Sequence, residues 1–219
     1  MPGTVKGATV AGAPAAAMSE SRSVKVVLIG DGAVGKTSLL TRYSSDEFNP
    51  EHEPTVFENT WLDRVIDGRR VELALWDNAG QEEFDKLRLL SYQDTDAFLV
   101  LYSINSMDAF NHVKKKWLPE IKEYCQGVPL LLIGTKCDLR GGNIEVVSAE
   151  EGQELQKDIG AAVYMECSAM TSENCSAVFE QAVREALASQ DNRKALTRGK
   201  TAKAKAAPKR PGMKFCTIC

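Results

Sequence analysis

The stretch VKVVLIGDGAVGKTSLLTRY, from Val24 to Tyr43, decides the fold. Its first part, Val24 to Gly30, is apolar except for Lys25 and is typical of a buried strand, and the part that begins at Lys36 is typical of a helix start. The loop between them follows the pattern G-x-x-x-x-G-K-[ST], whose glycines let successive backbone N–H groups point at a phosphate chain. The sequence therefore predicts a strand, a phosphate-binding loop and a helix.

This phosphate loop carries the first candidate site residues. Lys36 supplies a point charge for the β and γ phosphates, and Thr37 supplies a hydroxyl oxygen for Mg²⁺. The alternative is a glycine-rich turn before a helix, but both glycines, the lysine, the threonine and the flanking pattern are present. The residues expected to bind nucleotide here are Gly30, Asp31, Gly32, Ala33, Val34, Gly35, Lys36, Thr37 and Ser38.

The rest of the chain alternates strand-like and helix-like segments. FENTWLDRVID and RRVELALWD meet across Asp67–Gly68, a strong β-hairpin signal, so one antiparallel edge strand is expected. Apolar runs at 97–104, 128–136 and 161–169 alternate with helical patterns around 109–124 and 176–187. This order predicts an α/β fold of the P-loop NTPase type, with a doubly wound, mostly parallel six-stranded sheet.

The segment LALWDNAGQEEF ends its apolar run at Asp77. Ligands of doubly wound sheets bind beyond the carboxyl ends of the strands, so Asp77 is placed to hold Mg²⁺ through a water. Gly80 lets a backbone N–H approach the γ-phosphate, and Gln81 can orient an attacking water. DNAG alone would be a common turn, but its position after a phosphate loop and a hairpin favours the catalytic interpretation.

Two later strand ends carry residues suited to guanine. In GTKCD, Asp138 can accept hydrogen bonds from guanine N1 and N2, which adenine cannot donate, and Lys136 can lay its stem over the purine ring. In ECSAM, Ser168 and Ala169 can present backbone N–H groups to guanine O6. Each segment alone would be an ordinary polar loop, and only their order along the chain supports a guanine site.

The ordered motifs GDGAVGKT, PTVFEN, WDNAGQEEFDKLR, GTKCDLR and ECSA resemble those of Ras-superfamily small GTPases, over about Val24 to Ala188. Within that superfamily, the chain resembles the Rho family and its Rac-like members most. The features that it shares with them are PTVFEN, LRLLSY, Thr135 in place of the more usual Asn, and Trp76. The resemblance implies a place for Thr135 in the nucleotide site.

The resemblance also assigns residues of the first switch segment, switch I. Thr55 is implied to close on Mg²⁺ and the γ-phosphate, and Phe48 to pack against the guanine. For Phe48 the alternative is a core aromatic that anchors the loop.

A switch that binds and hydrolyses GTP with Mg²⁺ is the activity that the resemblance implies. Gln81, Lys36 and Thr55 are then catalytic, and Thr37, Thr55 and Asp77 hold the metal. Switch I contains no Arg, so intrinsic hydrolysis is expected to be slow and an activating protein to supply an arginine. The other implied partners are an exchange factor, a dissociation inhibitor, and effectors that bind switch I and switch II, the segment after Asp77. The implied pathway leads to the actin cytoskeleton.

The sequence departs from the family pattern in three places. Asn78 stands where Thr is usual, which either changes switch II or is a tolerated polar swap. His52 stands where Tyr is usual, which either weakens a cover over the phosphates or is an exposed loop residue. The extra helix typical of Rho proteins has no counterpart between Arg140 and Ser148. Regulators that use that helix are therefore not expected to bind this chain.

Length and composition predict one domain with tails. The chain has 219 residues, of which 43% are hydrophobic and 26% charged. We expect an extension without order at 1–22, in which Met18 is an alternative start, the GTPase domain at 23–190, and a basic tail at 191–219. The six scattered cysteines resemble the usage of a reducing compartment more than a disulfide framework.

The tail predicts a membrane anchor. Residues 193–214 hold nine of the 27 basic residues and none of the 30 acidic ones, which favours a polyanionic partner. The ending CTIC is a C-a-a-X signature that predicts prenylation of Cys216; a redox or metal C-x-x-C pair is the alternative. Lipid and basic residues together give stable anchoring. No aromatic residues interleave the lysines, so nucleic acid is not expected as a partner.

We therefore expect the chain at the cytoplasmic face of the plasma membrane or endomembranes, with a cytosolic pool. Two other functions fit part of the sequence. A nucleotide-locked scaffold would follow if Asn78 and His52 suppressed turnover, although Gln81 and Gly32 argue against it. The other is a P-loop ATPase or nucleotide kinase, which the guanine-type motif TKCD disfavours. Competition between GTP and ATP for binding distinguishes it from a GTPase.

Overall fold

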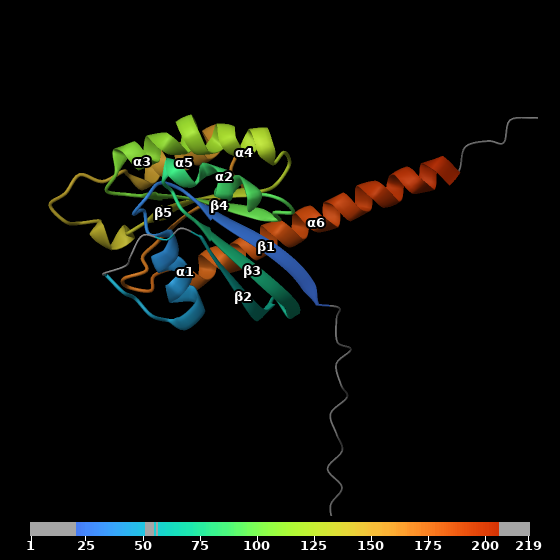
Figure 1. The fold of residues 1–219 in the computed structure, drawn as a ribbon, viewed down its shortest axis with the longest axis horizontal. Helices are drawn as coiled ribbons and strands as arrows, with labels where there is room; N and C mark the ends of the chain where they lie inside the picture. The colour runs from blue at the N-terminus through green and yellow to red at the C-terminus, as the bar shows by residue number, and fades with distance from the viewer. Residues whose placement is uncertain (1–20, 51–54, 56, 206–219) are drawn as a thin grey trace, which may run out of the picture.

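The structure, a computed structural model, describes residues 21–50, 55 and 57–205. A six-stranded sheet with the order β2-β3-β1-β4-β5-β6 lies between two layers of helices (Figure 1). Helices α1 and α6 cover one face, and the helices from α2 to α5 cover the other. The strands are β1 Arg22–Ile29, β2 Phe57–Ile66, β3 Arg69–Asn78, β4 Ala97–Ser103, β5 Leu130–Thr135 and β6 Val163–Cys167. The α-helices are α1 Lys36–Ser45, α2 Asp85–Leu90, α3 Met107–His112, α4 Leu118–Tyr124, α5 Ala149–Ile159 and α6 Cys175–Lys205.

The predicted sheet topology is confirmed. β1 pairs in parallel with β3 and β4, and β4, β5 and β6 continue the parallel arrangement. β2 alone is antiparallel and lies at the sheet edge. Asp67 and Gly68 have φ values of 50° and 76°, the two positive angles that a tight type I′ hairpin requires. The expected α/β fold, with one antiparallel edge strand, is therefore correct.

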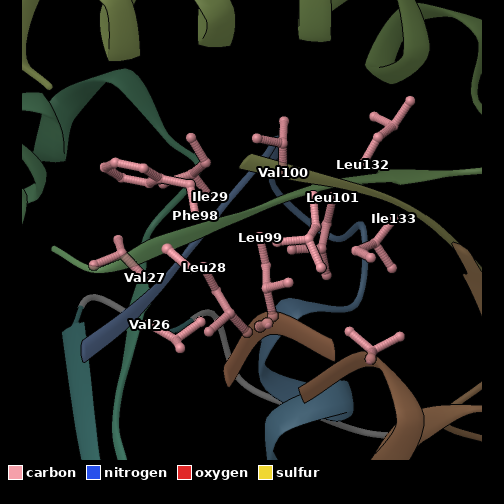
Figure 2. Packing of buried hydrophobic residues seen from close by; sticks show 14 of the residues in the cluster. Val26, Val27, Leu28, Ile29, Phe98, Leu99, Val100, Leu101, Leu132 and Ile133 are labelled. Atoms are coloured by element: carbon pink, nitrogen blue, oxygen red, sulfur yellow. The ribbon is translucent and has the colours of Figure 1, made fainter. Parts of the chain in front are cut away.

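The central strands are buried on both faces because they consist almost entirely of branched aliphatic and aromatic residues. Figure 2 shows Leu99 and Leu101 pointing toward α1 and α6, and Phe98 and Val100 pointing toward the opposite helices. Every residue of β4 is buried. This continuous core holds the carboxyl ends of β1, β3, β5 and β6 at one edge of the sheet.

The helix predicted around 109–124 forms as three consecutive segments. A π-helical turn, Val113–Trp117, separates α3 from α4. Pro119 follows at the start of α4, and it has no N–H to donate to the carbonyl four residues earlier. The wider turn accommodates this break and places Trp117, which is fully buried, against the core.

The loop between β5 and α5 is short. Two 3₁₀ turns occur in the described chain, at Glu82–Phe84 and Cys137–Leu139. Residues 140–148 follow the second of them as turns and extended chain without a helix, as expected. A capping box formed by Ser148 and Glu151 then begins α5.

Parts of the expected tails lie outside the described residues. These are 1–20 and 206–219, including Cys216. α6 continues to Lys205, past the expected domain boundary at 190. Within the described ranges, no helix is both long and apolar enough to cross a membrane.

Candidate functional site

A cavity of about 640 Å³ opens beyond the carboxyl ends of the strands. Loops that are far apart in sequence line it together. The predicted site residues in its wall are Gly32, Ala33, Gly35, Lys36, Thr37, Ser38, Phe48, Thr55, Gly80, Gln81, Thr135, Lys136, Asp138, Ser168 and Ala169. Residues that sequence reasoning did not assign to the wall also line it: Leu39, Asn49, Pro50, Asn78, Ala79, Leu139, Cys167 and Met170. The structure thus brings most of the predicted residues into one hollow.

Four predicted nucleotide-binding residues do not line this cavity. Val34 packs in the core. A Cβ on Gly30 would lie 2.2 Å from the Leu101 carbonyl oxygen, so glycine is needed there for close packing of the loop against β4. Asp77 is fully buried behind Thr37. The fourth, Asp31, turns its side chain away from the hollow.

Asp31 instead contacts α3 and the π-helical turn. Its Oδ1 accepts a hydrogen bond from Trp117 Nε1 at 2.8 Å, and its Oδ2 lies 2.6 Å from His112 Nδ1. That Asp31 binds nucleotide stays a prediction, and in this structure its side chain contacts α3 and the π-helical turn and does not line the cavity. Its backbone carbonyl instead accepts a hydrogen bond from Lys36 Nζ at 2.7 Å. The sequence pattern does not predict these contacts, because His112 and Trp117 lie 81 and 86 residues further along the chain.

The phosphate loop is built to receive an anion. Lys36 is only 6% exposed, and its Nζ also donates to the Gly30 carbonyl at 2.9 Å. Gly35, at φ 94°, begins α1 without a side-chain cap. The first N–H groups of a helix have no intrahelical acceptor, so this terminus is suited to phosphate oxygens.

Three hard oxygen donors meet beside Lys36. Thr37 Oγ1 lies 2.7 Å from Thr55 Oγ1 and donates a short hydrogen bond to Asp77 Oδ2. These are the three predicted metal ligands. Within residues 21–50, 55 and 57–205, no group of three or more His, Cys, Asp or Glu side chains could hold a metal ion. Two hydroxyls and one carboxylate fit Mg²⁺, which takes few protein ligands and shares phosphate oxygens.

The turn that follows Asp77 packs directly on the phosphate loop. A Cβ on Gly80 would lie 2.4 Å from Gly32 N and 2.5 Å from the Gly30 carbonyl oxygen, so only glycine fits. Asn78 is buried, donates from Nδ2 to the Leu28 carbonyl at 3.4 Å, and its Oδ1 has no hydrogen-bond partner among the described residues. His52, the other unusual residue, lies outside those residues.

The opposite end of the cavity is formed by the two loops suggested for guanine. Lys136 adopts φ 61° and donates from Nζ to the Ala33 carbonyl at 3.0 Å. Thr135 Oγ1 donates to the Val34 carbonyl at 2.5 Å, which ties β5 to the phosphate loop. Arg42 of α1 donates from Nε to the Ala169 carbonyl at 2.8 Å. Three loops are thereby joined around one space.

Arg88 anchors switch II from behind. It is 1% exposed, and its guanidinium donates twice to Glu120, at 2.9 Å each, and once to Asp85 at 2.7 Å. Its Nη1 also donates to the Ala79 carbonyl at 3.3 Å, and its guanidinium lies 4.7 Å from the Trp117 ring. No local pattern predicts this contact, because Glu120 lies in α4, 32 residues further along the chain.

We expect Arg88→Met to lower the free energy of unfolding by about 3–5 kcal/mol, because it removes a buried guanidinium and leaves the partly buried Glu120 carboxylate without its partner. Urea denaturation of the nucleotide-loaded protein measures this. Lys114→Met, which removes a half-exposed pair with Asp158, should cost less than about 1 kcal/mol. Equal losses of unfolding free energy in the two variants would show that Arg88 stabilises the fold no more than an exposed ion pair does.

Nucleotide affinity should fall above pH 8 because of Lys36. Burial lowers the pKa of Lys36 to about 8, against the opposing influence of Asp77 and Asp31. Phosphate favours the charged ammonium, so binding raises this pKa and requires proton uptake above pH 8 but not below it. The Kd for GDP should therefore rise by up to about tenfold per pH unit above pH 8.

Displacement of a fluorescent GDP between about pH 6.5 and 9 tests this dependence. Lys36→Arg, whose side chain stays charged, serves as the control and should lose the slope. If GDP affinity still fell with pH in Lys36→Arg, a titratable group other than Lys36 would cause the pH dependence.

A family model described as the Ras family matches residues 25–188 of the chain. The match covers more than half of the 219 residues and contains the whole cavity described above. Guanine nucleotide binding with Mg²⁺, and hydrolysis of GTP, are general properties of this family, and regulators and effectors act on its members. This chain belongs to the Ras family.

Proposed function

We propose that the chain is a Rho-like, Rac-related GTPase that acts as a membrane-anchored switch toward the actin cytoskeleton. One observation carries the switch mechanism of this proposal: the hydroxyls of Thr37 and Thr55 meet each other beside Asp77, while Gly80 packs on the phosphate loop. Both switch segments therefore converge where a γ-phosphate would lie. Its loss after hydrolysis would release them.

The side chains of the cavity have separate tasks. The Lys36 ammonium offsets the charge of the β and γ phosphates, and the Gly80 N–H approaches the γ-phosphate. Gln81 lies in the cavity wall, where its carboxamide can orient a water for in-line attack. Thr37, Thr55 and Asp77 would hold Mg²⁺, which when bound would stabilise the charge on the transferring phosphoryl group. At the far end, Asp138 accepts from guanine N1 and N2, and Phe48 packs against the ring.

Intrinsic turnover is slow in this proposal. The residues that line the cavity within the described chain include no arginine, and Arg42 is engaged with the Ala169 carbonyl. An activating protein supplies the missing cation and accelerates hydrolysis by about 10³–10⁵. An exchange factor releases GDP, and a dissociation inhibitor covers the lipid.

The subfamily assignment is supported by the motifs PTVFEN and GTKCD and by Trp76. The missing helix at 140–148 excludes regulators that require it. Membrane anchoring is supported by the C-terminal C-a-a-X at Cys216 and by the basic residues of 193–214. α6 continues to Lys205 and runs away from the body of the domain (Figure 1).

A GTP-bound scaffold is the second candidate function. The buried Oδ1 of Asn78, which lacks a hydrogen-bond partner among the described residues, favours it. An unsatisfied amide next to Asp77 could disturb the position of the attacking water. The two functions differ in turnover and share the binding of GTP.

Single-turnover hydrolysis of bound GTP with Mg²⁺, with and without an activator of Rho proteins, tests the proposal. We expect a slow intrinsic rate, an acceleration of about 10³-fold or more, and no competition by ATP. Asn78→Thr should leave the intrinsic and the activator-stimulated rates within a few fold of the wild-type values. No acceleration in the wild type, restored by Asn78→Thr, would favour the scaffold; binding of ATP would overturn the guanine assignment.

A further inference from the structure

An ion pair between Arg140 and Glu166 joins the two loops at the guanine end of the cavity, and neither residue lines the cavity itself. Arg140 Nε donates to Glu166 Oε2 at 2.6 Å, and its Nη2 donates to Glu166 Oε1, so the guanidinium grips the carboxylate with both sides of its fork. The same Nη2 donates to the Val147 carbonyl at 2.9 Å. The side chains are 31% and 17% exposed. A two-point contact of this kind fixes orientation as well as distance.

The positions of the two residues relate the pair to the base. Arg140 follows Asp138 by two residues, and Glu166 precedes Ser168 by two residues. Neither Arg140 nor Glu166 lines the cavity, whereas Asp138 and Ser168 do. The pair therefore connects the stem of one base-contacting loop to the stem of the other.

Two tyrosines, the partly buried Tyr164 and the buried Tyr102, support the carboxylate from another side. The Tyr164 hydroxyl donates to Glu166 Oε1 and lies 3.0 Å from the Tyr102 hydroxyl. A Cβ on Gly152 of α5 would lie 2.2 Å from the Tyr164 ring, so the absence of a side chain there makes room for the phenol. Glu166 is thus held by Arg140 in the loop after β5 and by Tyr164 of its own strand, and Tyr164 in turn contacts Tyr102 of β4.

The electrostatics keep this network charged. Burial alone would raise the pKa of Glu166, but hydrogen bonds from Arg140 and Tyr164 outweigh it and hold the pKa below its usual range. Burial raises the pKa of Tyr102 to about 12, and burial together with Glu166 raises the pKa of Tyr164. The tyrosines therefore remain neutral donors around an ionised carboxylate.

We propose that Arg140 and Glu166 are positioning residues for guanine recognition, whose ion pair holds Asp138 in register with the backbone N–H groups of Ser168 and Ala169. The inference rests on the proposed function, because it requires a guanine nucleotide in this cavity. Asp138 must meet two donors on one edge of the base while the other loop meets O6, so a small relative shift of the loops weakens both sets of contacts.

The test compares GDP with IDP, which lacks the 2-amino group that Asp138 is proposed to bind. Dissociation constants and dissociation rates are measured on the full chain for the wild type, Arg140→Met and Glu166→Gln. We expect both variants to release GDP about tenfold faster and to lose about threefold or more of the wild-type preference for GDP over IDP. Arg140→Lys, which keeps the charge without the fork, should recover part of that preference.

Arg184→Met is the matched control, because Arg184 grips Asp67 with a similar fork, at 2.9 and 3.0 Å, away from the cavity. It should leave the ratio of GDP to IDP affinity unchanged. Glu166→Gln preserves the side-chain shape, and thermal unfolding of each variant checks that the fold is retained.

Three results would overturn the proposal. Equal weakening of GDP and IDP would reduce the ion pair to a structural role, and so would the same loss of preference in Arg184→Met. Binding of neither nucleotide by the folded wild type would overturn the proposed function itself. That failure is distinct, because the first two results require a wild type that binds GDP tightly.

Discussion

Asp138→Asn is expected to lower GDP affinity by about 10⁴-fold and to make xanthosine diphosphate the better ligand. A carboxylate accepts from both guanine N1 and N2. An asparagine amide offers one acceptor and one donor, so its N–H₂ group faces the guanine amino group without a partner. Xanthine replaces that amino group with a carbonyl, which accepts from the amide. Asp138 is in the cavity wall, in the turn that follows β5.

Competition against a fluorescent guanine nucleotide measures both affinities. Asp158→Asn, at an exposed aspartate of α5 that pairs with Lys114, is the control and should leave them unchanged. If Asp138→Asn lost GDP and xanthosine diphosphate equally, Asp138 would support the loop instead of contacting the base.

Gln81→Leu is expected to remove activator-stimulated hydrolysis, a loss of about 10³–10⁵ in rate, while GTP affinity stays within a few fold. Leucine fills a similar volume but can neither donate to nor accept from a water. The phosphate contacts of Lys36 and Gly80 do not depend on the carboxamide, so binding should persist. The variant should accumulate in the GTP-bound state.

Phosphate release under single-turnover conditions measures this loss, with Gln126→Leu at an exposed loop position as the matched control. If neither the wild type nor Gln81→Leu hydrolysed GTP with the activator present, Gln81 would have no role in hydrolysis. The scaffold would then become the better account of the protein.

Local patterns carried the prediction of the fold. The apolar runs of the central strands, the glycine pattern before Lys36 and the Asp67–Gly68 turn each depend on near neighbours in the chain. The same holds for the absent helix at 140–148. The helix at 109–124 was predicted as one piece, and its π turn depends on how Trp117 packs against the core, which periodicity does not report.

By itself, the sequence determined the order of the strands and helices, the phosphate loop and the set of oxygen and amide groups available for a nucleotide. The tertiary structure alone decided how these groups are held. It turned Asp31 toward Trp117, placed Arg88 against Glu120, and joined Arg140 to Glu166. Such contacts join residues that are distant in the chain, and their geometry depends on the packing of whole elements, so no local pattern encodes them.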